Sequence, residues 1–258
     1  MQSLDKTFAG LFSGDVAVVT GGAQGIGFAA ASGLAAAGCR VVILDRAGDR
    51  ADQAAKEITS AGHSCIARQL DIASSDECRQ LAAEIGRTVG AVAVLINNAG
   101  TSTGAKLADE NFDAELHRVF GVNLFGLLNV SRAFLSQLEQ TRGAIVNVSS
   151  ITAFVAGSSN VPYASSKAAV TQATRSMARE LGLKGVRVNA IAPGLTKTPL
   201  AAKVLQDQER VSRNVDRSAL KRLAETEDMV GPILFLASRM SSYVTGVTLP
   251  VDGGYLAC

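Results

Sequence analysis

The sequence predicts an α/β protein with a doubly wound parallel sheet and helices on both faces. Short apolar runs rich in β-branched residues alternate with amphipathic stretches of helix length, as in right-handed βαβ units. The first of these runs leads through a glycine-rich turn into an alanine-rich helix. No internal repeat, low-complexity tract or Pro/Ser-rich linker interrupts the 258 residues, so we expect a single domain over residues 1–258.

Five apolar runs are the predicted strands. Each is apolar almost throughout instead of alternating with polar residues, which suits a strand that is covered on both faces. The predicted strands are Val16–Thr20, Val41–Asp45, Val92–Asn97, Ala144–Ser150 and Val186–Pro193.

Helical periodicity is clearest after Pro162, which is a favourable first residue of a helix. Apolar residues then recur at steps of three or four, at Val170, Ala173, Met177 and Leu181. A long stretch with an apolar stripe, Asn111–Gln140, is also predicted to be helical.

Composition and charge favour a globular protein with a small-molecule partner. Hydrophobic residues make up 47% of the chain and charged residues 19%, with a net charge of +2. Because the charges are scattered, the sequence shows neither a nucleic-acid footprint nor a membrane footprint. The N-terminal residues contain no continuous apolar segment of the kind found in export signals, and no apolar run approaches the length of a membrane span.

The cysteine and histidine patterns do not indicate a metal site. The two histidines, His63 and His117, accompany neither a nucleophile nor a cluster of ligands. The four cysteines form no CxxC pair: Cys39, Cys65, Cys78 and Cys258. We therefore expect reduced thiols in a cytoplasmic protein and no bound metal.

The glycine-rich turn TGGAQGIG, Thr20–Gly27, is the first candidate binding site. Gly21, Gly25 and Gly27 let the backbone turn tightly and approach a pyrophosphate, and the free N–H groups at the helix start favour an anion. A plain tight turn is the alternative. The strand before the turn and the helix after it favour a dinucleotide site.

Asp45 ends the second predicted strand, 18 residues after Gly27, close to the offset of an acid that binds ribose hydroxyls. Its carboxylate would repel a 2′-phosphate, and Gln24 between the glycines supplies no cation. NAD is therefore predicted in preference to NADP, although the adjacent Arg46 could weaken that preference. The alternative is that Asp45 only caps the helix that follows.

Tyr163 and Lys167 are four residues apart near the start of a predicted helix, so their side chains share one face. Taken alone, such a pair is usually part of a solvated helix face. Ser149 and Ser150 could likewise simply end a strand. Their occurrence together with the phosphate turn favours a catalytic role instead.

Taken together, these motifs resemble those of the short-chain dehydrogenase/reductase family. The spacing of twelve residues between Ser150 and Tyr163 also fits that family, and the match covers nearly the whole chain. In chain order the motifs are TGGAQGIG (Thr20–Gly27), NNAG (Asn97–Gly100), Asn123 in GVNLFG, Ser150 in NVSS, YASSK (Tyr163–Lys167), PGLTKT (Pro193–Thr198) and PVDGGY (Pro250–Tyr255).

The resemblance implies a Rossmann-like fold with about seven parallel strands and a nicotinamide cofactor across their carboxyl ends, where the switch-point rule also places a ligand. The catalytic residues it implies are Asn123, Ser150, Tyr163 and Lys167. Together with the phosphate turn and Asp45, the predicted cofactor-binding residues are Gly21, Gln24, Gly25, Ile26, Gly27, Asp45, Arg46, Asp71, Ile72, Asn98, Ala99, Gly100, Tyr163, Lys167, Pro193, Gly194, Thr196 and Thr198.

Hydride transfer between a nicotinamide and a carbonyl carbon gives the oxygen alkoxide character, so the site needs a proton donor at that oxygen. Tyr163 is the predicted general acid/base. A free phenol has a pKa of about 10, and positive charge from Lys167 and the oxidised nicotinamide would bring it closer to neutral pH. Ser150 is expected to hydrogen-bond the substrate oxygen. Asn123, by the resemblance alone, is expected to hold a water that links Lys167 to solvent.

Residues 195–222 show no strand pattern, and the resemblance predicts a mobile substrate lid there. Seven Lys/Arg and three Asp/Glu between Lys197 and Arg222 would suit an acidic substrate or a phosphopantetheine carrier. A solvated helical face is the ordinary alternative.

Three functional hypotheses follow. The leading one is an NAD-dependent oxidoreductase that interconverts a secondary alcohol, such as a polyol, sugar or hydroxy acid, and its ketone. The second is a reductase of 3-oxoacyl thioesters on acyl carrier protein that uses NADPH, which the basic lid permits and Asp45 opposes. The third is an NAD-binding sensor or structural subunit without turnover, against which the intact Ser150, Tyr163 and Lys167 argue.

The expected partners are a small-molecule alcohol or ketone and further copies of the chain. The stretch Asn111–Gln140 and the apolar C-terminal stretch Thr245–Cys258 could bury surface between subunits or equally pack within one chain. Because the resembling family is most often tetrameric, we expect a homo-oligomer, either a tetramer or a dimer.

Overall fold

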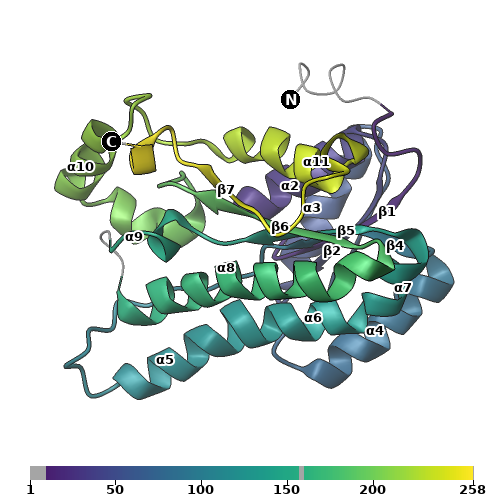
Figure 1. Ribbon diagram of the computed structural model, residues 1–258, viewed down its shortest axis with the longest axis horizontal. Coiled ribbons are helices and arrows are strands. Elements are labelled where there is room, and N and C mark those ends of the chain that lie inside the picture. Colours follow the sequence, from purple (N-terminus) through teal and green to yellow (C-terminus); the bar gives the residue numbers. More distant parts are fainter. Residues whose placement is uncertain (1–9, 157–159, 258) are drawn as a thin grey trace.

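The computed structural model describes residues 10–156 and 160–257. Residues 1–9, which belong to the N-terminal stretch without an export signal, and Cys258, which is predicted to be a reduced thiol, lie outside the described residues. The centre of the structure is a seven-stranded sheet with the order β3-β2-β1-β4-β5-β6-β7 (Figure 1). Every neighbouring pair of strands is parallel, which confirms the predicted doubly wound sheet. The strands are β1 (Val16–Thr20), β2 (Arg40–Asp45), β3 (Cys65–Gln69), β4 (Val92–Asn97), β5 (Ala144–Val148), β6 (Arg187–Pro193) and β7 (Thr248–Val251).

The central strands follow the apolar runs closely. β1 and β4 have the predicted bounds, and β5 ends at Val148, two residues before the predicted end. The two edge strands, β3 and β7, are not among the five runs. A strand at the edge of the sheet has fewer covered positions, so β3 alternates between buried and exposed residues and β7 is only partly buried. Neither edge strand therefore shows a continuous apolar run.

Helices cover both faces of the sheet, in two layers with separate hydrophobic cores (Figure 1). One layer contains α2, α3 and α11, and the other contains α4, α6, α7 and α8. The helices of the first layer are α2 (Gly25–Ala36), α3 (Gly48–Ser60) and α11 (Val230–Ala237). Those on the other side are α4 (Ser75–Thr88), α5 (Phe112–Phe120), α6 (Leu127–Ala133), α7 (Leu135–Thr141) and α8 (Val161–Leu181).

The stretch predicted as one helix, Asn111–Gln140, is divided in the structure. A π-helical segment, η1 (Gly121–Gly126), joins α5 to α6, and a bend of 56° separates α6 from α7. A Cβ on Gly126 would lie 2.6 Å from Ile72 Cγ1, so the π segment packs more closely than a larger residue allows. The prediction of a helix was right in type and wrong in continuity.

Among the described helices, no single one is both long and apolar enough to cross a membrane, although Phe112–Ala133 with Leu135–Thr141 passes that test as a bent pair by length and composition alone.

The segment predicted as a lid is mostly helical. It contains η4 (Pro199–Ala201), α9 (Ala202–Leu205) and α10 (Gln208–Arg217), which lie to one side of the sheet (Figure 1). The remaining short helical turns are η2 (Ile151–Ala153), η3 (Gly182–Lys184), η5 (Thr226–Met229), η6 (Arg239–Ser241) and η7 (Tyr255–Ala257).

Candidate active site

A cavity of about 820 Å³ lies across the carboxyl ends of six strands, which is large enough for a dinucleotide and a small substrate. Its walls come from the loops that follow β1 to β6 and from the predicted lid. The structure brings together most of the predicted site residues here: Gly21, Gln24, Gly25, Ile26, Asp45, Arg46, Asp71, Ile72, Asn98, Ala99, Gly100, Ser150, Tyr163, Lys167, Pro193, Gly194, Thr196 and Thr198. Two predicted residues, Gly27 and Asn123, do not line the cavity.

The glycine-rich turn has the geometry that an anion needs. Gly21 and Gly25 have φ angles of 62° and 58°, a region where glycine is favoured, and α2 begins at Gly25 without a side-chain cap or an acidic residue in its first turn. A Cβ on Gly27 would lie 2.2 Å from the Gly21 carbonyl oxygen. Gly27 thus serves the turn by packing behind it, and the free N–H groups of α2 remain available to a pyrophosphate.

Asn98 supports this turn from β4. Its side-chain amide donates to the carbonyl oxygens of Thr20 and Gly21, both at 3.0 Å. The Thr20 hydroxyl in turn accepts from the backbone N–H groups of Asn98 and Ala99, both at 3.1 Å. The cofactor side of the cavity is therefore held by hydrogen bonds between two neighbouring strand ends.

Asp45 connects β2 to the same turn. Its carboxylate accepts from the backbone N–H groups of Ala23 at 3.2 Å and of Ala47 at 3.0 Å. The N-cap of α3 is Ala47, and it makes no side-chain cap bond, so Asp45 does not cap that helix as the alternative interpretation supposed. The carboxylate lines the cavity, as a group that binds ribose hydroxyls must.

Arg50 is a cavity-lining cation that sequence reasoning missed. It lies in the first turns of α3, donates to the side-chain oxygen of Gln24 at 2.7 Å and lines the cavity together with Arg46. The signal for Arg50 was its position four residues after Arg46. Two guanidinium groups therefore line the same cavity as the Asp45 carboxylate that argues for NAD.

The first turn of α8 positions Tyr163. Asn160 is the N-cap, and its side-chain oxygen accepts from the Tyr163 backbone N–H at 3.0 Å. Pro162 follows at a favoured position of the first turn, as the sequence predicts. Tyr163 and Lys167 then lie on one face, with the Lys167 ammonium 5.8 Å from the centre of the tyrosine ring.

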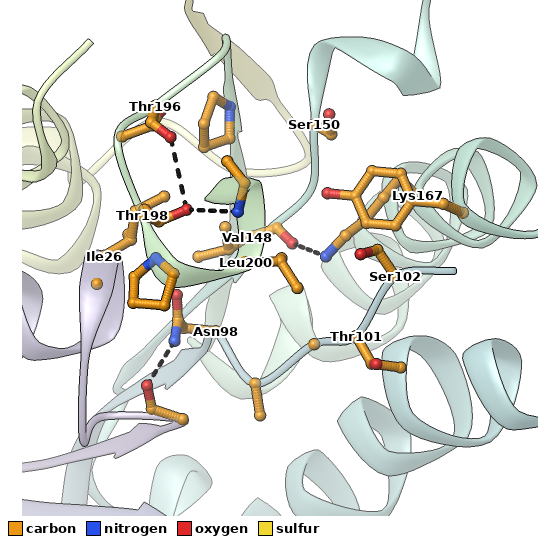
Figure 2. Close-up of a pocket in the computed structure, with 18 of the residues that line it drawn as sticks. Ile26, Asn98, Thr101, Ser102, Val148, Ser150, Lys167, Thr196, Thr198 and Leu200 are labelled. Carbon is orange, nitrogen blue, oxygen red and sulfur yellow. Dashed lines mark hydrogen bonds between the residues drawn. The ribbon is translucent and has the colours of Figure 1, made fainter. Parts of the chain in front are cut away.

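Lys167 is not part of a solvated helix face. Its side chain is buried, and Nζ donates to the Val148 carbonyl oxygen at 2.8 Å (Figure 2). Burial lowers the pKa of Lys167 to about 8. Burial raises the pKa of Tyr163, and a hydrogen bond with the Ser150 hydroxyl opposes that shift. Positive charge beside the phenol is therefore needed to bring its pKa toward neutral pH.

Ser149 and Ser150 do more than end β5. The Ser149 hydroxyl donates to the Lys167 carbonyl oxygen at 2.9 Å and lies 2.9 Å from the Thr171 hydroxyl. These buried bonds fix β5 against α8, so Ser150, which follows β5, and Tyr163, on α8, are held in place relative to each other.

Asn123 lies in the π segment next to this group, and its side chain is fully engaged. Its oxygen accepts from Thr101 N at 2.8 Å, and its nitrogen donates to the Thr101 carbonyl oxygen at 3.0 Å and the Ser166 hydroxyl at 2.9 Å. A Cβ on Gly100 would lie 3.3 Å from Asn123 Oδ1 and 3.5 Å from Lys167 Nζ. Asn123 therefore approaches Lys167 across Gly100, while its predicted water-holding role stays a prediction.

The predicted substrate end of the cavity is lined by residues that are not among the predicted site residues. Four of them, Leu200, Val204, Arg210 and Asn214, belong to the predicted lid, in keeping with the rule that loops and lids carry specificity. The residues of the predicted substrate end are Ser102, Thr103, Lys106, Arg118, Asn160, Leu200, Val204, Arg210, Asn214 and Tyr255. Figure 2 shows Thr101, Ser102 and Leu200 around the space next to Lys167.

The described cysteines are free thiols buried in the core, at Cys39, Cys65 and Cys78. Burial raises the pKa of Cys65 to about 12 and that of Cys78 to about 11, so neither is a nucleophile near neutral pH. No group of three or more potential metal ligands occurs in the part of the chain that the structure describes.

Comparison with known proteins places the chain among dehydrogenases and reductases. Residues 21–256 match the family described as Enoyl-(Acyl carrier protein) reductase. The chain is 41% identical to an L-rhamnose 1-dehydrogenase (NAD(P)(+)) of Azotobacter vinelandii, over 92% of this chain and 94% of that protein. It is 34% identical to the 3-oxoacyl-[acyl-carrier-protein] reductase FabG of Thermotoga maritima, over 93% of this chain and 97% of that protein.

A solved structure shares the whole architecture. A gluconate 5-dehydrogenase from Burkholderia cenocepacia, in complex with NADP and tartrate, superposes with a TM-score of 0.91 at 33% sequence identity, and the match covers 99% of each chain.

Proposed function

The chain belongs to the short-chain dehydrogenase/reductase family, and from that membership we propose that it is an NAD-dependent oxidoreductase for a secondary alcohol and its ketone. Members of this family act on alcohol groups with NAD(P). The finer part of the proposal is the substrate type, a polyol, sugar or hydroxy acid, and the preference for NAD.

The convergence of Ser150, Tyr163 and Lys167 in one cavity carries the proposal. Ser150 and Lys167 are buried, burial raises the pKa of Tyr163 whereas the Ser150 hydroxyl lowers it, and all three residues line the cavity that the glycine-rich turn also lines. Binding of a cofactor does not require a phenol and a hydroxyl close to each other. A substrate whose carbonyl oxygen gains and loses a proton requires both groups at that oxygen.

The nicotinamide cofactor, when bound, supplies the hydride that is added to or removed from the substrate carbon. Tyr163 gives a proton to the substrate oxygen in reduction and takes it back in oxidation. Ser150 donates a hydrogen bond to the same oxygen and stabilises its negative charge. Lys167, which is largely protonated below its pKa of about 8, favours the ionised phenol and so brings the proton transfer closer to neutral pH.

Backbone groups at the start of α2 would hold the cofactor's pyrophosphate, and Asp45 would hold the adenosine ribose. Asp71 and Ile72 would contact the adenine, and Pro193, Gly194, Thr196 and Thr198 the nicotinamide side, as the family resemblance implies. All of these residues line the cavity.

A 3-oxoacyl-[acyl-carrier-protein] reductase that uses NADPH is the second candidate function. The Thermotoga relative and the basic lid support it. The matching family description also names a reductase that acts on acyl carrier protein, although on an enoyl group instead of a 3-oxo group. Arg46 and Arg50 beside the ribose site also suit a 2′-phosphate, whereas the Asp45 carboxylate opposes one.

The decisive experiment is a panel of polyols, sugars, hydroxy acids and a 3-oxoacyl thioester, each tested with NAD(H) and NADP(H) by absorbance of the reduced nicotinamide. We expect turnover of a sugar-like alcohol with NAD. Turnover of the thioester alone, with NADPH, would establish the second candidate instead.

Tyr163→Phe separates an enzyme from an NAD-binding sensor or structural subunit. We expect turnover to fall by about 10²–10⁴-fold, the usual contribution of a general acid, while NAD still binds. Turnover equal to that of the unmodified protein would exclude Tyr163 as the proton donor.

We also propose a cytoplasmic homo-oligomer, a tetramer or a dimer. Each of the two stretches that could bury surface between subunits exposes an apolar side chain, Phe125 at 56% and Leu249 at 36%. The mass of the protein in solution tests the assembly.

A further inference from the structure

The loop of residues 101–104 forms a wall at the substrate end of the cavity. It follows the NNAG motif at the end of β4, has no regular secondary structure, and all four of its residues line the cavity. Such a loop must be held by side-chain bonds if it is to present a fixed surface to a substrate.

Two of its anchors come from α5 and the π segment. Arg118 donates to the Thr101 hydroxyl at 2.8 Å and to the Ser102 carbonyl oxygen at 2.9 Å, while Glu115 holds the guanidinium through two bonds. Asn123 makes two bonds with the backbone of Thr101. These bonds fix the first half of the loop against one layer of helices.

The third anchor is Asn160, which joins the loop to the catalytic helix. Its side-chain oxygen accepts from Tyr163 N, and its side-chain nitrogen donates to the Thr103 carbonyl oxygen. Asn160 also lines the cavity. One amide group thus connects the backbone of the predicted acid with the wall that faces it.

We infer that Asn160 is a positioning residue, which sets the distance between the loop of residues 101–104 and Tyr163 and thereby the pose of the substrate between them. The inference rests on the proposed function, because it concerns the alcohol or ketone that Tyr163 acts on. The gap between the loop of residues 101–104 and Tyr163 fits a small polar substrate that accepts hydrogen bonds from the loop or donates them to it.

The side chain of Asn160 does two separable things. As an N-cap it stabilises α8, which any short side chain with an oxygen acceptor also does. As a bridge it needs an acceptor and a donor about an amide's width apart, which serine is too short to provide. Asn160→Ser therefore keeps the cap and loses the bridge, and Asn160→Ala loses both.

The test uses steady-state kinetics of the full chain with the best alcohol or ketone of the panel above. We expect Asn160→Ser and Asn160→Ala to lose at least about tenfold in kcat/KM for that substrate, as misplacement of a reacting group does, with the KM of the cofactor unchanged. Only Asn160→Ala should lower Tm. Ser74→Ala is the matched control, because Ser74 caps α4 through the Glu77 N–H, outside the loop, and its loss should lower Tm without changing kcat/KM.

Two results would overturn the inference: Asn160→Ser with the kcat/KM of the unmodified protein, or a parallel change in the KM of the cofactor. The proposed function is tested separately by the unmodified protein. If that protein turns over an alcohol while the Asn160 variants match it, only the inference about Asn160 fails; if it turns over none, both fail.

Discussion

The two ends of the cavity are built in different ways. The predicted cofactor end is formed by backbone, with Gly21 and Gly25 in the left-handed region and partly buried amide bonds from the Asn98 side chain. The substrate end is formed by side chains that are partly exposed and often ion-paired, such as Arg118 with Glu115 and Arg210 with Asp207. A tight backbone turn leaves almost no room for an added side-chain atom. Each exposed ion pair, in contrast, contributes little to the stability of the fold. The predicted cofactor end is therefore expected to tolerate fewer substitutions than the predicted substrate end.

The predicted catalytic residues that follow β5 and lie on α8 are between these two ends. The largest effect of a substitution on activity is expected there. Lys167→Met removes the ammonium beside Tyr163 and keeps a long apolar side chain in the buried space. We expect kcat to fall by about 10²-fold or more, because proton transfer loses the charge that tunes the phenol. Steady-state rates with saturating cofactor measure the loss. A variant that keeps full activity would contradict the assignment of Lys167.

The same variant has a distinct effect on stability. Burial lowers the pKa of Lys167 from 10.5 to about 8, so between these pH values the unfolded chain binds more protons at this lysine than the folded chain. The lysine therefore destabilises the fold below about pH 8, by up to about 3 kcal/mol, and this cost disappears as the pH rises toward 10.5. Denaturant unfolding should show the stability of the unmodified protein rising relative to Lys167→Met across that window. A constant difference would contradict the lowered pKa.

A single added methyl group is expected to disrupt the glycine-rich turn at the cofactor end of the cavity. In Gly27→Ala the new Cβ would lie 2.2 Å from the Gly21 carbonyl oxygen and 2.4 Å from the Asn98 side-chain nitrogen, so the turn must move. We expect a loss of about 1–3 kcal/mol in unfolding free energy and a rise in the Kd of the cofactor of at least about tenfold. Thermal unfolding and fluorescence titration of the reduced cofactor measure both.

The control for this change is Gly182→Ala. Gly182 follows α8 with helical backbone angles, φ −57° and ψ −39°, and a Cβ added there would meet no neighbouring atom within 4 Å, so alanine should not destabilise the fold and should leave cofactor binding unchanged. Equal effects of the two substitutions would mean that close packing at Gly27 does not support the turn.

The sequence predicted the residues of the cofactor end better than those of the substrate end, and the difference has a physical reason. Backbone shape and the spacing of residues along a helix depend on local sequence. They could therefore be predicted from the order of the glycines, from Asp45 at a strand end, and from the pair Tyr163 and Lys167. The edge strands β3 and β7 and the break at η1 could not be predicted in this way, because sheet edges and π segments depend on distant neighbours such as Ile72 beneath Gly126.

The substrate wall was equally hard to predict. Asn160 could have been recognised as an N-cap before Pro162, but its bond to Thr103 joins residues 57 positions apart and follows only from the fold. Arg118 likewise reaches Thr101 and Ser102 from another element.

Asp45→Asn tests the choice of cofactor, with an intermediate effect. The backbone N–H groups of Ala23 and Ala47 bond to different carboxylate oxygens, so the amide oxygen keeps one of these two bonds, and the change removes the charge that repels a 2′-phosphate. We expect the ratio of kcat/KM for NAD over NADP to fall about tenfold, which corresponds to about 1.4 kcal/mol. Asp49→Asn, a change of the same charge in the first turn of α3 but outside the cavity lining, is the control. An unchanged ratio in Asp45→Asn would leave Arg46 and Arg50 as the groups that decide the preference.

The smallest effect is expected at the base of the lid, where Arg222 donates to both carboxylate oxygens of Asp228 at 2.6 and 2.7 Å. These side chains are partly exposed, so Arg222→Gln should lower the unfolding free energy by no more than about 1 kcal/mol. Because the pair holds the end of the segment that is predicted to cover the substrate, the KM of the substrate should rise by up to about fivefold, with that of the cofactor unchanged. Salt near 1 M should reduce the difference from the unmodified protein, since it screens exposed charges.

Lys184→Gln provides the comparison for Arg222→Gln, because Lys184 pairs with Glu139 at 3.9 Å outside the cavity lining. It should lose as little stability as Arg222→Gln and change neither KM. If Arg222→Gln raised the KM of the cofactor more than that of the substrate, the base of the lid would belong to the cofactor end, and the division of the cavity into a rigid and a variable end would be wrong. If it changed only the substrate's KM, and only at low salt, weak exposed pairs would be sufficient to tune substrate binding on a scaffold whose chemistry they do not touch.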